Sequence, residues 1–129
     1  MIKKKVLIVD DDPNIVRSLS FILEKEGYMV IAASDGEEAL KKVKEELPHL
    51  IILDIMLPKI DGFQVYKRLK ANTKTKGIRT AVLTAKGEEN DKRLGQELGV
   101  DAYITKPFNV DALLSEVRKI LNQDQMIWK

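Results

Sequence analysis

Apolar and polar residues follow two kinds of pattern along this chain. Short apolar runs are each followed by polar or charged residues, and between them lie segments whose apolar residues recur every three or four positions. The runs predict strands buried on both faces of a sheet, and the segments predict helices with one apolar face. The clearest run occupies positions 50–53 and is followed directly by Asp54. Further strands are predicted at 6–9, 28–33, 81–84 and 102–105, and helices from the apolar stripes that begin at Ile15, Leu40, Val65, Leu94 and Leu113.

Cap signals support several of these helices. Pro13 is typical of a first helical turn, and Asp12 before it is the expected N-cap. Ser34 and Glu37 have the spacing of a capping box, which predicts the start of the second helix. Asn109 is the expected cap of the last helix.

The ends of the elements complete the topology. The second helix has Leu47 as the last residue of its stripe and is expected to end before Pro48, while residues 72–79 read as a polar loop. Strand and helix then alternate five times, which predicts one α/β domain with a parallel sheet and helices on both faces. We expect this domain to span 1–122, with 123–129 as a tail or the start of a linker.

Composition mainly excludes functions. The 129 residues suffice for one sizeable core, and 22 basic against 20 acidic residues leave a net charge of +2. That charge is too small to predict direct binding to nucleic acid or to an anionic membrane. No apolar run is long enough to cross a membrane, and the start of the chain does not resemble a signal peptide. The chain has no Cys, which excludes disulfides and fits a cytoplasmic location.

Five polar residues stand at or just after the ends of predicted strands: Asp10, Asp11, Asp54, Thr84 and Lys106. The carboxyl ends of parallel strands meet at one edge of a sheet, where ligands bind in open α/β folds. Crowded carboxylates repel one another, and oxygen ligands without His or Cys suit Mg²⁺. An acidic cluster with a metal, a lysine and a hydroxyl indicates phosphoryl transfer, with Asp54 as the nucleophile that forms an acyl phosphate.

The order of short motifs along the whole chain resembles that of response-regulator receiver domains. The matching pieces are Val-Asp-Asp-Asp at 9–12, Leu-Asp-Ile-Met-Leu-Pro at 53–58, Asp-Gly at 61–62, Leu-Thr-Ala at 83–85 and Lys-Pro-Phe at 106–108. The resemblance implies a flavodoxin-like fold with strand order 2-1-3-4-5, with Asp54 as phospho-acceptor. It also implies a cis bond between Lys106 and Pro107.

The resemblance implies roles for the surrounding residues as well. Asp10 and Asp11 resemble the acidic pair that organises Mg²⁺, with Asp54 and the Met56 carbonyl as further ligands. Lys106 resembles the lysine that contacts the phosphoryl group. The switch hydroxyl and the aromatic switch residue of the family correspond to Thr84 and Tyr103.

Partners and output follow from the same resemblance. The phosphoryl group is expected to come from a phospho-histidine of a sensor kinase or of a histidine phosphotransfer protein. The face formed by the fourth helix, fifth strand and fifth helix is expected to change and to engage a target, an output domain or a second copy of the chain. Met56 and Lys86, two residues after Asp54 and Thr84, are expected to tune the lifetime of the phosphoryl form. The sparsely apolar segment 88–98 is expected to be the most mobile part of this face.

Several alternatives remain open on the residues alone. Asp12 is assigned as a helix cap rather than as a metal ligand, and Tyr103 could be an ordinary packed strand aromatic. An Asp-nucleophile phosphatase usually has a second Asp two positions after the first, where this chain has Met56. A flavodoxin needs a phosphate-binding loop after the first strand, where three aspartates would repel phosphate. A receiver that serves only for docking would not need Asp54, Thr84 and Lys106 together.

Overall fold

The computed structural model describes residues 3–85 and 89–122 of the chain. Five parallel strands form one sheet in the order β2-β1-β3-β4-β5, which confirms the predicted flavodoxin-like topology. The strands are β1 (Lys5–Val9), β2 (Met29–Ala33), β3 (Leu50–Asp54), β4 (Arg79–Ala85) and β5 (Ala102–Lys106), and the helices are α1 (Pro13–Lys25), α2 (Gly36–Glu46), α3 (Gly62–Lys70), α4 (Glu89–Leu98) and α5 (Val110–Leu121). The predicted tail at 123–129 and Lys86 lie outside the described residues.

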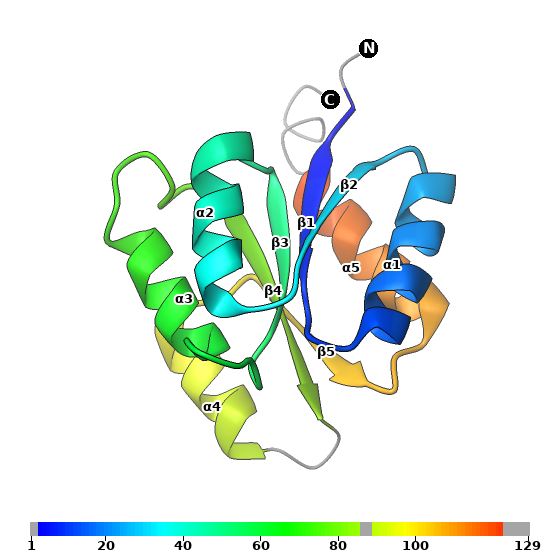
Figure 1. Ribbon diagram of the computed structural model, residues 1–129. Coiled ribbons are helices and arrows are strands. Elements are labelled where there is room, and N and C mark those ends of the chain that lie inside the picture. Colours follow the sequence, from blue (N-terminus) through cyan, green and yellow to red (C-terminus); the bar gives the residue numbers. More distant parts are fainter. Residues whose placement is uncertain (1–2, 86–88, 123–129) are drawn as a thin grey trace.

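The helices cover the sheet in two layers. In Figure 1, α1 and α5 lie on one face of the sheet, and α2, α3 and α4 lie on the other. Two apolar clusters correspond to these layers, because alternate residues of a strand face opposite sides. In β3, Leu50 and Ile52 pack with the α1 and α5 side, whereas Ile51 and Leu53 pack with α2 and α3. All residues of β3 are buried, as the uninterrupted apolar run predicts.

Side-chain caps fix the starts of four helices. Asp12, Asp61 and Asn109 each accept a hydrogen bond from a backbone N–H in the first turn of α1, α3 and α5, respectively. The capping box predicted from Ser34 and Glu37 is wrong by one residue, although its chemistry is right.

The cap of α2 is Asp35, and its partner is Glu38. Asp35 Oδ1 accepts from the Glu38 N–H at 2.8 Å, while Glu38 Oε1 accepts from the Ser34 N–H at 2.6 Å. Both Ser34 and Asp35 are good capping residues, so the spacing alone did not distinguish them.

Two predicted boundaries also differ from the structure. Strand β4 is longer than the apolar run at 81–84, since it begins at Arg79, which was assigned to the loop, and continues to Ala85. Leu47 does not extend the α2 stripe but adopts a left-handed conformation at the C-cap, with φ of 45°, and is 53% exposed. Hydrophobic periodicity does not indicate how far a central strand extends beyond its apolar run. It also does not distinguish an apolar residue at a helix C-cap, such as Leu47, from one within the apolar stripe.

Two glycines allow the loops around the end of β3 to approach closely. A Cβ atom at Gly62 would lie 2.5 Å from the carbonyl oxygen of Asp54. A Cβ atom at Gly36 would lie 2.3 Å from the carbonyl oxygen of Ile60. Real Cβ atoms do not come this near backbone atoms, so any side chain at these positions must displace the chain that follows Asp54.

We expect Gly62→Ala to destabilise the protein by about 1–3 kcal/mol, the usual scale of overpacking. Gly77→Ala is the matched control, because its Cβ would meet nothing within 4 Å. Urea unfolding of both variants measures the difference. Equal midpoints for the two variants would show that the close approach at Gly62 is not a constraint.

Candidate functional site

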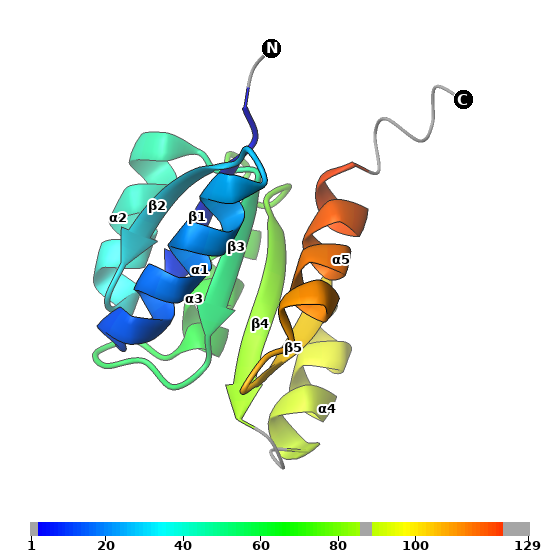
Figure 2. The ribbon, with the colours of Figure 1, turned by 90° about the vertical axis from the view of Figure 1, so that its right-hand side faces the viewer.

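The predicted site residues lie at one end of the sheet. Asp54 and Lys106 are the last residues of β3 and β5, Asp10 follows β1 directly, and Thr84 is the penultimate residue of β4. The strands are parallel, so their arrowheads point to one end of the molecule, the lower end in Figure 2. This end is the carboxyl edge at which open α/β sheets bind ligands.

Three carboxylates and one ammonium group meet there. Asp10, Asp11 and Asp54 each place an oxygen within 4.8 Å of the others. Lys106 Nζ lies 2.8 Å from Asp10 Oδ2 and 2.9 Å from Asp54 Oδ2. Lys106 is thus in direct contact with Asp10 and Asp54 rather than merely opposite them. It connects the end of β5 with the end of β3 and with the residue that follows β1.

Backbone donors hold the remaining oxygens of the two buried acids. Asp10 Oδ1 accepts from the Asp12 N–H at 2.9 Å, and Asp54 Oδ1 accepts from the Met56 N–H at 3.1 Å. Each of these carboxylates is therefore fixed on one side by the chain and on the other by Lys106. Asp11 is exposed, in contrast to Asp10 and Asp54, which are 1% and 5% exposed.

Burial and charge shift the pKa values of the central pair. Burial raises the pKa of the Asp54 carboxyl, against the opposing hydrogen bonds from Lys106 and the Met56 N–H, and the charge of Asp10 raises it further. For Lys106, burial lowers the pKa, but the hydrogen bonds and charges of Asp10 and Asp54 together raise it above its usual value. Lys106 therefore stays positively charged at neutral pH and offsets part of the cost of ionising the acids.

The chemistry of the group fits a divalent cation. The cluster has three carboxylates and one ammonium group, which contacts two of them, so the ionised groups carry two excess negative charges. Asp10 Oδ2 is buried, and among the described residues its one polar contact is with Lys106 Nζ at 2.8 Å. Carboxylate oxygens of this kind, with room for water on the exposed Asp11 side, are the ligands that Mg²⁺ prefers.

Thr84 and Tyr103 lie on the other face of the sheet from the Lys106 contacts. Thr84 is 7% exposed, and its hydroxyl donates to the Ala85 carbonyl at 3.2 Å. In the register of β4 and β5, Val82 pairs with Tyr103, and Thr84 is two residues further along the same face. The structure thus brings Asp10, Asp54 and Lys106 into contact, with an Asp11 oxygen within 4.8 Å of the other two carboxylates. Thr84 lies at the same end of the sheet, on β4, and its hydroxyl is bonded to the Ala85 carbonyl.

The loop after β3 has long-range contacts that the sequence did not indicate. Lys59 has a φ of 69°, and its ammonium lies 3.5 Å from Asp35 Oδ2 and 3.7 Å from Glu37 Oε2. The loop that contains Met56 is held against the start of α2 by these ion pairs and by the close contact between Gly36 and Ile60. The partners are more than twenty positions apart, so no local pattern indicated them.

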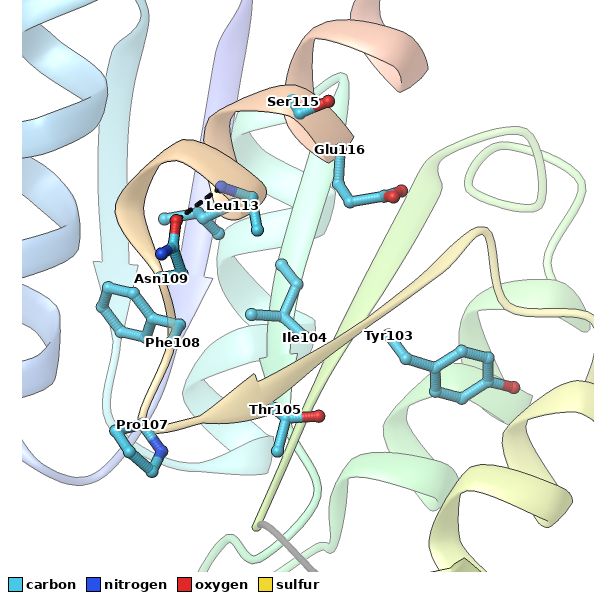
Figure 3. A pocket seen from close by; sticks show the side chains of 10 residues that line it. Tyr103, Ile104, Thr105, Pro107, Phe108, Asn109, Leu113, Ser115 and Glu116 are labelled. Carbon is cyan, nitrogen blue, oxygen red and sulfur yellow. Dashed lines mark hydrogen bonds between the residues drawn. The ribbon is translucent and has the colours of Figure 1, made fainter.

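Two cavities flank this end of the sheet. One, of about 390 Å³, is lined by Asp10 and Asp11 together with Val16 and Arg17 of α1. Another, of about 440 Å³, lies between β5 and α5 and is drawn in Figure 3. The first opens beside the carboxylates, whereas the second includes none of them.

Comparisons with known proteins agree with this geometry. The sequence profile of the response regulator receiver domain family matches residues 6–118. The chain is 51% identical, over 95% of its length, to the alkaline phosphatase synthesis transcriptional regulatory protein PhoP of Bacillus subtilis. It is 38% identical, over 93% of its length, to the phosphate regulon transcriptional regulatory protein PhoB of Escherichia coli. These alignments cover 50% and 52% of the relatives, so the chain spans about half the length of the curated relatives it matches.

Solved structures show the same fold. A response regulator from Chloroflexus aurantiacus superimposes with a TM-score of 0.89 at 38% identity, covering 93% of this chain and 98% of that one. The chemotaxis response regulator CheY4 of Vibrio cholerae superimposes with a TM-score of 0.85 at 32% identity, covering 92% of this chain and 99% of that one.

Fold and site therefore define a doubly wound α/β signalling domain with an acidic crevice at the carboxyl ends of its strands. The chain belongs to the response regulator receiver domain family. Receiver domains are signalling phospho-acceptors in two-component systems; phosphorylation by a sensor kinase is general in the family, as is binding of Mg²⁺. Among the helices of the described residues, none is long and apolar enough to cross a membrane.

We expect Asp11→Ala to weaken Mg²⁺ binding by about ten-fold or more. Loss of a residue that only supports a metal ligand already has an effect of this size, and Asp11 is expected to be a ligand itself. Asp12→Ala is the matched control, because Asp12 Oδ1 instead accepts from the Asn14 N–H at the start of α1. That variant should lose about 1 kcal/mol of stability with little change in Mg²⁺ affinity. Calorimetric titration with Mg²⁺ and urea unfolding separate the two effects; matching affinities would contradict the assignment.

Proposed function

We propose that this chain is a phospho-accepting receiver in which Asp54 takes a phosphoryl group from a phospho-histidine of a sensor kinase or a histidine phosphotransfer protein. The observation that carries the proposal is the setting of Asp54. Its carboxylate is fixed by the Met56 N–H and by Lys106 at the buried end of β3, beside two further acids. The proposed domain spans 1–122.

The transfer forms a bond between an Asp54 carboxylate oxygen and phosphorus, while the bond from phosphorus to the donor imidazole nitrogen breaks and leaves its electron pair on that nitrogen. Asp54 must be ionised to attack, and Lys106 favours this form against the effect of burial. Lys106 is also placed to contact the phosphoryl oxygens, because its ammonium already lies 2.9 Å from Asp54 Oδ2.

Asp10, Asp11, Asp54 and the Met56 carbonyl are the groups that we assign to Mg²⁺. When bound, the cation supplies positive charge that neutralises the transferred oxygens. Within the protein, the two backbone hydrogen bonds to Asp10 and Asp54 keep the carboxylates in place. Such preorganisation is the main contribution that a protein makes to phosphoryl transfer.

The proposed output is a change of the α4-β5-α5 face. Thr84 and Tyr103 share one side of neighbouring strands, so a movement of the Thr84 hydroxyl toward a phosphoryl group on Asp54 would open space on the side of Tyr103. The partners that we propose for this face are a downstream target, an output domain or a second copy of the chain in a phosphorylation-dependent dimer. Relatives named as transcriptional regulators, which are about twice as long, support the output domain.

A phosphatase with an Asp nucleophile is the main alternative. Met56 stands two residues after Asp54, where such an enzyme usually has a second Asp, and its side chain is 74% exposed. Met56 has no group that could protonate a leaving oxygen. Met56 at this position therefore favours a long-lived phosphoryl group on Asp54 over rapid hydrolysis of that group.

Incubation with a small acyl-phosphate donor and Mg²⁺ should add one phosphoryl group, which intact-mass measurement detects. Asp54→Asn should abolish the added mass, because an amide is a poor nucleophile. Asp12→Asn is the control, since it keeps the cap of α1 and should be phosphorylated like the unaltered protein. Equal phosphorylation of Asp54→Asn would show that the acceptor lies elsewhere.

The phosphoryl form should decay faster in Met56→Asn than in the unaltered protein. An amide at this position can hydrogen-bond an attacking water, whereas the thioether of Met56 is only a weak acceptor. Met56→Leu is the control and should keep the slow decay. Intact mass followed over time gives the rates; identical decay in the two variants would assign the lifetime to other features of the site.

A further inference from the structure

The ring of Tyr103 rests on a glycine of the neighbouring helix. Figure 3 shows Tyr103 leaving β5 on the side of α4, away from the α5 residues that line the cavity. A Cβ atom at Gly95 of α4 would lie 2.5 Å from Tyr103 Cε1 and 2.6 Å from its hydroxyl oxygen. The ring therefore occupies the space that any other residue at position 95 would fill. We call this contact the Gly95 seat.

A glycine at this position is costly for α4. Relative to alanine, a glycine inside a helix lowers the folding equilibrium constant about 2- to 5-fold. Helix α4 also has few apolar anchors, since Leu94 is 37% exposed and Leu98 is only partly buried. The three atoms nearest to a Cβ at Gly95 all belong to the Tyr103 ring and its hydroxyl. Gly95 thus weakens a helix that is already poorly anchored, and the absence of its side chain leaves space for the ring of Tyr103.

The seat holds the Tyr103 ring by packing and not by a hydrogen bond. The ring packs with a small cluster that includes Val82, Leu98 and Val100. Its hydroxyl oxygen is buried, and within the described residues it has no hydrogen-bond partner. Nearby Tyr66 differs, because its hydroxyl donates to the Leu98 carbonyl at 3.2 Å. A buried hydroxyl without a partner is unfavourable, so the seated position competes with positions that satisfy this group.

An alternative position lies along the same face of the sheet. Tyr103 pairs with Val82 in the strand register, and Thr84 is the next residue of β4 on that face. The Thr84 hydroxyl is bonded to its own neighbour, the Ala85 carbonyl, and not to Tyr103. As the ring lies, it contacts Gly95 and makes no hydrogen bond with Thr84.

We propose that Gly95 is a positioning residue of the switch: it provides the seat for the Tyr103 ring on α4 and so sets the fraction of molecules in which Tyr103 is turned away from Thr84. The inference rests on the proposed function, in which phosphorylation favours the position near Thr84. A ligand that favours one of two states binds more tightly when the competing state is weakened. A side chain at position 95 should therefore favour the phosphorylated state without touching the acceptor site.

The first test is Gly95→Ala in protein labelled with 3-fluorotyrosine. The ¹⁹F signal of Tyr103 should shift, while the signal of Tyr28, which packs on the other side of the sheet, serves as the internal reference. Gln96→Ala, at an exposed position of α4, is the control and should leave the Tyr103 signal in place. This measurement needs no phosphorylation, so it tests the seat even if the proposed function fails. An unmoved Tyr103 signal in Gly95→Ala would overturn the inference.

The second test measures the affinity for beryllofluoride with Mg²⁺, a stable mimic of the phosphoryl group. If about nine-tenths of the molecules hold the ring in the seat, its loss should raise this affinity up to about ten-fold. Unchanged or weaker binding by Gly95→Ala, with binding by the unaltered protein intact, would overturn the inference. Absence of binding by the unaltered protein would instead contradict the proposed function, and the first test would still decide whether the seat exists.

A third measurement guards against a general loss of folding. In a Tyr103→Ala background, Gly95→Ala should raise the folding equilibrium constant about 2- to 5-fold, as alanine does in an ordinary helix. In the presence of Tyr103, the same change should gain less or lose stability, because the ring must move. Equal gains in both backgrounds, from urea unfolding, would show that residue 95 and Tyr103 do not interact and would contradict the inference.

Discussion

The ion pairs of Lys106 with Asp10 and Asp54 are the interaction on which the crevice depends. These groups come from the ends of β5, β1 and β3, which are far apart in the sequence. Two buried carboxylates side by side repel each other strongly in a medium of low polarity, and Lys106 offsets this repulsion. The remaining excess of negative charge would favour a divalent cation at this site. Lys106 thus allows Asp10 and Asp54 to be buried, but its single positive charge does not neutralise all of the carboxylates.

The sheet supplies the precision that this arrangement needs. Alternation places Asp10, Asp54 and Lys106 on the side of the sheet that α1 and α5 cover, and it places Thr84 and Tyr103 on the side of α3 and α4. Direct ionic contact is therefore confined to the first set. The loop after β3 is held just as closely, because Gly62 and Gly36 let backbone approach backbone and Lys59 is paired with Asp35 and Glu37.

Much of this architecture could be predicted from the sequence, because buried strands and helix starts have local sequence patterns. The uninterrupted run before Asp54 indicated a strand buried on both faces, and the caps at Asp12 and Asn109 are where the sequence places them. The cap of α2 was misplaced because Ser34 and Asp35 are chemically similar neighbours. Close approaches such as those of Gly36 to Ile60 and Gly95 to Tyr103 join distant segments. No pattern in the sequence distinguishes such a glycine from one in an open loop, such as Gly77.

Strand β5 connects the chemistry of the crevice to the outer face. Lys106 and Tyr103 are three residues apart on this strand, and an odd spacing directs their side chains to opposite sides of the sheet. Lys106 contacts the carboxylates at one end, while Tyr103 lies against α4. Lys106 and Tyr103 belong to one continuous strand, which is paired with β4 from Ala102 to Lys106. Helix α4 has fewer buried apolar anchors, because Leu94 is exposed and Leu98 is only partly buried. In the proposed function, a change of charge at Asp54 would alter the α4-β5-α5 face through this strand and the weakly anchored helix beside it.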